Sequence, residues 1–204
     1  SDDGLMYSDS ASKANILNNQ FSSVFTRNED MTNFKDMGRS PYPAMESINI
    51  QPAGVLKILC SLQDHKATGP DELPSRLMKS LAHELTPVLT VLFQASLDQG
   101  EVPEDWKSAN VAPVFKKGER CKPENYRPIS LTSITCKILE HIVHSSVMDH
   151  LEDHNILCDA QHGFRKKRSC VSQLVLAIQD LARGIDNREQ LDVILLDFSK
   201  AFDK

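Results

Sequence analysis

The chain has 204 residues, a formal net charge of −5, and a composition of 40% hydrophobic and 25% charged residues. These values are typical of a globular protein and exclude wholesale disorder. No run of about eighteen apolar residues is present, so we expect no membrane partner, and the first residues lack the pattern of a secretory signal. Five cysteines without a Cys-x-x-Cys pair favour reduced thiols and an intracellular protein, in the nucleus or the cytoplasm.

The spacing of apolar residues predicts that most of the chain is α-helical. The predicted helices, in chain order, cover residues 10–26, 52–63, 74–83, 85–99, 132–153 and 170–184. Asp9 or Ser10 is expected to cap the first helix and Ser169 the last, while Gly100 is expected to end the fourth in a left-handed conformation. Residues 27–51 are polar and contain prolines, so we expect them to form a linker.

Three segments have the pattern of β-strands. Residues 109–115 and 126–131 are predicted to form a hairpin with a long polar loop. Residues 191–196 are the most strand-like, and Asp197 follows them directly. A carboxylate at the end of a buried strand is well placed to meet a divalent cation. The alternative, that Asp197 caps a helix beginning at Ser199, stays open.

Basic residues are clustered in two places that the negative net charge conceals. Six basic and two acidic residues lie between Lys107 and Arg127, and residues 165–168 are four consecutive basic residues. Such clusters favour binding to phosphates. The alternative interpretation is a solvated loop face without a ligand.

Three further observations carry less weight. The residues His150, His154, Cys158 and His162 recur every four positions, as zinc ligands on one helix face would, but we expect the helix to end before Cys158. Trp106 is interpreted as a packing residue near the hairpin. Cys136 and Cys170 lie in apolar helical contexts and are predicted to be core thiols.

Several blocks then occur in a specific order. They are residues 125–131 (NYRPISL), 137–140 (KILE), 161–165 (QHGFR) and 197–203 (DFSKAFD), preceded by 66–71 (KATGPD), 100–106 (GEVPEDW) and 113–118 (PVFKKG). In this order they resemble the reverse transcriptases of non-LTR, or LINE-type, retrotransposons, and the jockey and CR1 groups among them. The similarity covers essentially the whole chain.

The resemblance implies an α+β fold. The expected architecture is the mostly helical fingers region of a right-hand polymerase, with a β-hairpin and the first strand of the palm. It implies an N-terminal helix and linker at 1–52, fingers and the fingers–palm junction at 53–190, and an incomplete start of the palm at 191–204.

The resemblance also implies an RNA-directed DNA polymerase, a nucleotidyltransferase that uses two Mg²⁺ ions, an RNA template, a DNA primer and a dNTP. Asp197 matches the first metal-binding and catalytic aspartate, and the carbonyl of Phe198 matches a further metal ligand. Phe202 matches the aromatic residue that favours deoxynucleotides. The residues that match the grip on the triphosphate are Lys116 or Lys117, and Arg127. The residues that match a block near the template and nucleotide are Gln161, Gly163, Phe164 and Arg165.

One departure from the family pattern is large. The second catalytic block, which ends in Asp-Asp, does not occur in these 204 residues. We therefore expect a fragment that does not polymerise by itself, since one carboxylate cannot hold two magnesium ions. Two alternatives stay open: a remnant that binds nucleic acid without chemistry, whose affinity would fall steeply with salt, and a helical protein that binds partners through bare apolar faces.

Overall fold

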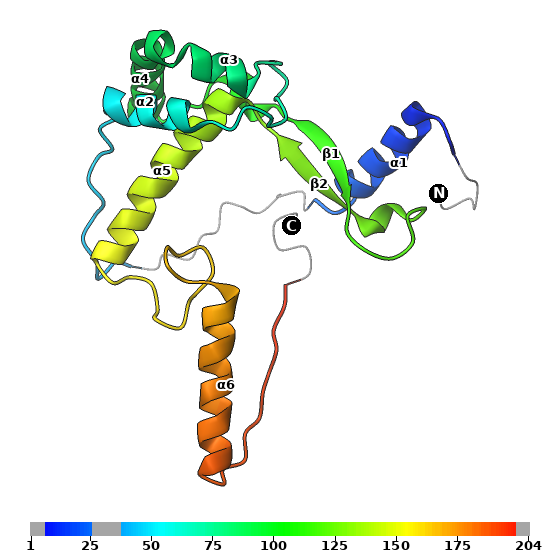
Figure 1. Ribbon diagram of the computed structural model, residues 1–204, viewed down its shortest axis with the longest axis vertical. Coiled ribbons are helices and arrows are strands. Elements are labelled where there is room, and N and C mark those ends of the chain that lie inside the picture. Colours follow the sequence, from blue (N-terminus) through cyan, green and yellow to red (C-terminus); the bar gives the residue numbers. More distant parts are fainter. Residues whose placement is uncertain (1–6, 26–37, 199–204) are drawn as a thin grey trace. The chain divides into compact units, whose positions relative to one another are not determined.

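The computed structural model describes residues 7–25 and 38–198 (Figure 1), which divide into two units. The first unit holds residues 7–25 and 47–144, and the second holds residues 38–46 and 145–198. Helices and one antiparallel pair of strands make up the described secondary structure, which confirms the α+β class. No helix in these two described ranges is long and apolar enough to cross a membrane.

The predicted helices and the hairpin are all present, with ends shifted by a few residues. The helices are α1 (Ser10–Ser22), α2 (Pro52–Ser61), α3 (Ser75–Ser80), α4 (Ala82–Gln99), α5 (Ile134–Asp153) and α6 (Cys170–Asp186). The strands are β1 (Asn110–Phe115) and β2 (Tyr126–Leu131), and short 3₁₀ helices occur at Glu104–Lys107 and Pro123–Asn125. The part of the expected linker that is described, residues 38–51, contains no helix or strand.

The helix ends follow from specific side chains. The Asp9 carboxylate accepts a hydrogen bond of 2.8 Å from the backbone N–H of Ser12, so Asp9 rather than Ser10 caps α1. Ser169 caps α6 in a reciprocal pair with Ser172. Gly100 ends α4 with φ of 68°, a left-handed conformation that glycine adopts without steric cost.

The hydrophobic core lies in the first unit, where α2 packs on α4 and the start of α5 completes the cluster. Its buried members are Ile50, Val55, Leu59, Met78, Ala82, Leu89, Phe93, Trp106, Ile134, Cys136, Ile138 and Leu139. The rings of Phe93 and Trp106 pack with their centroids 5.6 Å apart, so Trp106 is a packing residue, as predicted.

Cysteine burial differs from the prediction at one position. Cys136 is buried, as expected, whereas Cys170 is exposed at the first turn of α6, together with Cys60, Cys121 and Cys158. The apolar neighbours of Cys170 in sequence indicated a core position, but α6 itself leaves most of its apolar side chains exposed. All five thiols are free.

This difference predicts the reactivity of the thiols. Burial, and then the hydrogen bond and the charge of Glu140, raise the pKa of Cys136 from 9.0 to about 11. Because the thiolate is the reactive form, we expect alkylation by iodoacetamide at pH 8 to modify Cys136 roughly a hundredfold more slowly than the exposed cysteines. Peptide mass spectrometry over a time course measures this. Equal rates for Cys136 and Cys60 would contradict the burial of Cys136.

The strand expected at residues 191–196 does not form in the structure. These residues continue from α6 as a segment without secondary structure, and Leu195 and Leu196 are 91% and 88% exposed. A strand is stable only where its backbone groups pair with a neighbour, and in the described part of the chain no strand lies beside this segment. The expected first palm strand is therefore corrected to an unpaired segment.

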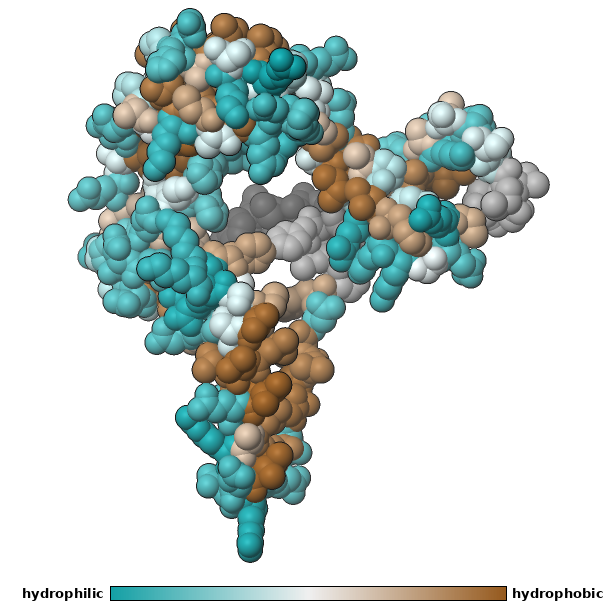
Figure 2. Space-filling model, viewed as in Figure 1, coloured by the Kyte–Doolittle hydropathy of each residue, from teal (hydrophilic) through white to brown (hydrophobic). Residues whose placement is uncertain are grey.

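An extensive apolar surface accompanies this segment in the second unit. Figure 2 shows hydrophobic residues gathered along α6 and the segment after it. The exposed apolar residues of α6 are Val171, Leu174, Val175, Leu176, Ile178, Leu181 and Ile185. Contiguous exposed apolar area of this kind marks a surface that is usually covered in a larger assembly.

Candidate nucleic-acid interface

The β-hairpin of the first unit carries three of the predicted phosphate-binding residues. In the antiparallel register Val114 lies opposite Arg127, and Phe115 lies opposite Tyr126. The backbone N–H of Lys116 donates to the carbonyl of Asn125 at 2.8 Å, which extends the ladder by one residue. The side chains of Lys116, Lys117 and Arg127 are exposed, and none of them takes part in the ion pairs found among the described residues.

The loop that joins the two strands is held by its own hydrogen bonds. The Asn125 side chain donates to the carbonyl of Glu119 at 2.9 Å, and the Tyr126 hydroxyl donates to the carbonyl of Arg120 at 2.9 Å. Gly118 has φ of 89°, and a Cβ there would lie 2.7 Å from the Asn125 amide nitrogen. The Arg120 guanidinium lies over the Phe115 ring, 5.1 Å from its centroid. These contacts order the backbone on which Lys116 and Lys117 are carried.

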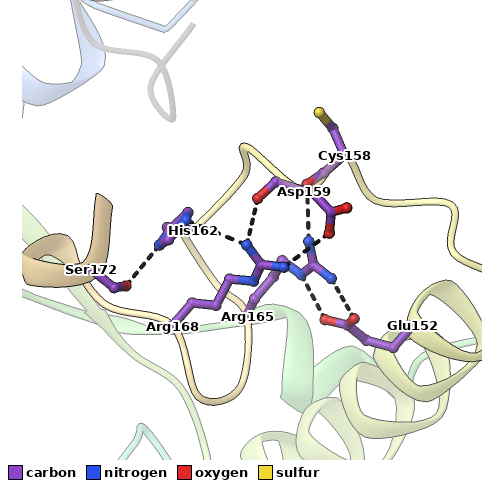
Figure 3. Close-up of polar contacts among 7 residues, drawn as sticks. All are labelled: Glu152, Cys158, Asp159, His162, Arg165, Arg168 and Ser172. Carbon is purple, nitrogen blue, oxygen red and sulfur yellow. Dashed lines mark hydrogen bonds and ion pairs between the residues drawn. The ribbon is translucent and has the colours of Figure 1, made fainter. Parts of the chain in front are cut away.

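The second predicted block, residues 161–165, lies in a loop of the second unit between α5 and α6. Figure 3 shows the polar contacts that hold this loop. The Arg165 guanidinium donates two hydrogen bonds to the Glu152 carboxylate on α5, at 2.8 and 2.6 Å, and a third to the carbonyl of Cys158 at 2.9 Å. Its side chain is only 8% exposed. Arg165 therefore fastens the loop to the end of α5 through a two-point contact.

A second arginine closes the other end of the loop. Arg168 donates to the backbone carbonyl of Asp159 and, at 3.1 Å, to the Asp159 carboxylate. It also lies 3.4 Å from Nε2 of His162 (Figure 3). On the other side of the ring, Nδ1 of His162 lies 2.7 Å from the Ser172 hydroxyl on α6, within hydrogen-bond distance. The buried His162 thus links the loop to α6.

The consecutive basic residues of this loop do not form a free cationic patch. Arg165 pairs with Glu152, Lys166 pairs with Asp149 at 2.9 Å, and Arg168 pairs with Asp159. The local excess of positive charge indicated by the sequence is therefore largely offset by acidic residues from α5 and from the loop itself. Sequence reasoning missed Glu152 because it lies thirteen positions before its partner, beyond any helical spacing.

Two residues of the loop have unusual backbone conformations. Phe164 has φ of 61° and Lys167 has φ of 62°, both in the left-handed region that bulky residues rarely adopt. Phe164 is 83% exposed, and Lys167 is also exposed. Gln161 and Gly163 are exposed as well, and the backbone N–H of Gln161 donates to the carbonyl of Cys158 at 3.0 Å.

The predicted metal-binding residues lie in the segment after α6. Asp197 and Phe198 are exposed, and Phe198 retains 83% of its accessible surface. Phe202 lies outside the described residues. Within the described ranges, no group of three or more His, Cys, Asp or Glu side chains is arranged to hold a metal ion, the four-residue His and Cys pattern included. That pattern breaks because α5 ends at Asp153 and Asn155 has φ of 50°.

The contact between Arg165 and Glu152 predicts a pH dependence. The hydrogen bonds from Arg165 lower the pKa of Glu152 below its ordinary value of 4.5. The folded state therefore holds this carboxylate ionised to lower pH than the unfolded chain does. The pair contributes its full stability above about pH 5, and this contribution is lost as the pH falls through the folded pKa.

We expect hydrogen exchange, corrected for its intrinsic pH dependence, to show loss of protection at residues 158–168 as the pH falls below about 5. Glu152→Gln should lower the protection at neutral pH and remove most of the change. If both proteins show the same pH profile, the Glu152 carboxylate does not hold the loop.

Comparisons with known proteins identify a family model and several relatives that the chain is similar to. Residues 114–204 match the family model for reverse transcriptase (RNA-dependent DNA polymerase). The probable RNA-directed DNA polymerase from transposon BS of Drosophila melanogaster is 30% identical over 166 residues, which is 79% of this chain and 18% of that protein. The RNA-directed DNA polymerase from mobile element jockey of the same species is 28% identical over 151 residues, 74% of this chain and 16% of that protein.

A further relative is the putative 115 kDa protein in the type-1 retrotransposable element R1DM, 26% identical over 179 residues, 85% of this chain and 17% of that protein. The chain thus spans less than a fifth of the length of these curated relatives. Its ordered motifs and these matches define it as part of a reverse transcriptase. It belongs to the reverse transcriptases of non-LTR retrotransposons.

Proposed function

We propose that this chain supplies the fingers and the start of the palm of an RNA-directed DNA polymerase that copies an RNA template from a DNA primer with dNTPs. In this proposal residues 1–52 precede the polymerase, residues 53–190 form the fingers and the fingers–palm junction, and residues 191–204 begin the palm. The observation that carries it is the β-hairpin, where the exposed side chains of Lys116, Lys117 and Arg127 form no ion pair among the described residues and lie inside the segment that matches the reverse transcriptase family.

The register of the hairpin supports a choice between the two candidate lysines. Side chains two positions apart on a strand share a face, so Lys116 lies on the same face as Val114 and as its partner Arg127. Diagonal neighbours in such a ladder are roughly 7–8 Å apart, a span that a triphosphate can bridge. We therefore assign the grip on the incoming triphosphate to Lys116 as a point charge and to Arg127 as a bidentate donor. Lys117 lies beyond the ladder, in the bend that leads to Gly118.

Asp197 and the carbonyl of Phe198 are proposed as ligands of Mg²⁺. Both provide oxygen, the donor atom that this ion prefers, and the Asp197 side chain is exposed. The oxygen donors of these two groups suit magnesium chemically. Two magnesium ions need more ligands than these two groups supply, so the ligand set is incomplete. When bound, the two ions stabilise the attacking and leaving oxygens of nucleotidyl transfer. In this proposal the Asp197 carboxylate supplies the anionic oxygen that binds the cation.

The remaining residues have proposed roles in selecting and placing substrates. Phe202 is proposed to exclude a ribose 2′-hydroxyl and so to favour deoxynucleotides. Gln161, Gly163 and Phe164 are proposed to lie near the template and nucleotide. Arg165, whose guanidinium is occupied by Glu152, contributes to that site by holding the loop in place.

A second candidate function is binding of nucleic acid without chemistry. Lys116, Lys117 and Arg127, which are exposed and form no ion pair within the described part of the chain, favour it because three phosphate contacts suffice for salt-dependent binding. An enzyme assay distinguishes a polymerase from a protein that only binds nucleic acid.

The decisive experiment replaces the matching segment of the jockey polymerase of Drosophila melanogaster with this chain and measures primer extension on an RNA template. We expect the chimera to extend the primer when supplied with Mg²⁺ and dNTPs. A soluble chimera that binds template and primer as tightly as the parent polymerase but does not extend would favour the second candidate.

A further inference from the structure

Phe164 and Lys167 combine exposure with a strained backbone in the loop between α5 and α6. Phe164 is 83% exposed, so its ring contributes little to the packing of the fold. Both residues are held in left-handed conformations, with φ of 61° and 62°. Backbone strain of this kind persists only where the surrounding structure determines it, and here the surrounding contacts belong to two arginines.

Lys167 differs from its basic neighbours in its ion pairing. Arg165, Lys166 and Arg168 each pair with an acidic side chain. Among the ion pairs of the described residues, none includes Lys167. The loop therefore presents one exposed aromatic ring and one uncompensated cation, three residues apart, on a backbone that is fastened at both ends.

We propose that Phe164 and Lys167 form a two-point contact for an unpaired nucleotide of single-stranded nucleic acid. The phenylalanine ring stacks on the base and the lysine ammonium binds a neighbouring phosphate. This inference rests on the proposed function, because it specifies how the loop meets the strand that is copied. A base within a duplex is already stacked on both faces, so the contact selects unpaired nucleotides.

Glu152 is a positioning residue in this arrangement. Its carboxylate does not meet the nucleic acid. It receives two hydrogen bonds from Arg165, the residue next to Phe164, and so fixes the backbone that carries the ring. Simple electrostatics predicts that removing this negative charge strengthens binding to nucleic acid, whereas the positioning role predicts that it weakens stacking. The two effects have opposite signs and can be told apart.

The first test introduces a fluorescent ring at the contact. Phe164→Trp retains an aromatic residue. The emission of the buried Trp106 is measured in the unchanged chain and subtracted from that of the variant. We expect a twelve-nucleotide oligouridylate to quench the emission of the introduced tryptophan by at least half at saturation. The matched control is Ile178→Trp on α6, where the native side chain is 64% exposed and the introduced ring should show no quenching. A blunt RNA duplex should quench neither variant.

The second test measures affinity by fluorescence anisotropy with labelled oligouridylate and its DNA counterpart, using the whole 204-residue chain. Phe164→Ala should weaken binding about tenfold with the same salt dependence. Lys167→Ala should reduce the slope of log affinity against log salt by about 0.7. The matched control Lys166→Ala should change that slope far less, because Asp149 offsets its charge. Binding of either single strand with this pattern supports the contact.

The third test adds Glu152→Gln to Phe164→Trp. We expect at least a threefold loss of quenching per molecule bound, even if overall affinity rises. Failure of the unchanged chain to bind single strands, equal affinity of Phe164→Ala and the unchanged chain, or stronger quenching by duplex would each overturn the inference. Primer extension by the chimera is measured separately, so the proposed function can hold when this inference fails.

Discussion

Replacing Asp197 by asparagine in the jockey chimera will lower primer extension at least about a thousandfold. Asparagine keeps the shape of the side chain and one oxygen but removes the negative charge that holds a divalent cation. Loss of a metal-held oxygen removes several kcal/mol of stabilisation from the transition state, and each ~1.4 kcal/mol is a factor of ten in rate. Steady-state extension with saturating dNTPs measures the effect, and template binding should stay within about twofold of the unchanged chimera.

The matched control is Asp192→Asn, the same chemical change five residues earlier in the same exposed segment. Its extension rate should remain within about twofold of the unchanged chimera. If the two variants behave alike, Asp197 is not a metal ligand, and the assignment of residues 191–204 to the start of the palm loses its main support.

Replacing Gly69 by alanine will destabilise the first unit by about 3 kcal/mol, near the upper end of the usual cost of overpacking. Gly69 is buried against the backbone that leads into α5, and an added Cβ would lie 2.5 Å from the nitrogen of Ser133 and 2.6 Å from the carbonyl carbon of Thr132. Backbone atoms cannot rotate away as a side chain can. The segment 66–71 must therefore separate from the start of α5. Urea denaturation followed by tryptophan fluorescence, with the single Trp106 as the probe, measures the change.

Gly54 provides the matched control for this substitution. It lies in the first turn of α2, is exposed, and has no atom within 4 Å of an added Cβ. Gly54→Ala should therefore stabilise the chain by roughly 0.5–1 kcal/mol, because alanine loses less conformational freedom in a helix than glycine. Equal effects at Gly54 and Gly69 would show that the close approach at Ser133 does not restrict residue 69.

The local elements of this protein follow from its sequence because their signals are local. Asp9, Gly100 and Ser169 determine where helices begin or end through contacts within a few residues. The two strands of the hairpin could be predicted for the same reason. The segment 191–196 could not, because its strand pattern describes a potential for pairing and the described chain offers it no partner.

The residues of the candidate site could be predicted from the sequence, whereas the contacts among their side chains could not. The sequence by itself determined which residues resemble the blocks of a reverse transcriptase and placed Lys116 and Arg127 on one hairpin. Only the tertiary structure decided that Arg165 pairs with Glu152 and that Arg168 pairs with Asp159. It also decided that Phe164 and Lys167 are exposed residues of the loop that take no part in these ion pairs. The physical reason is that ion pairing depends on distances between side chains from separate elements, which charge counts along the chain do not contain.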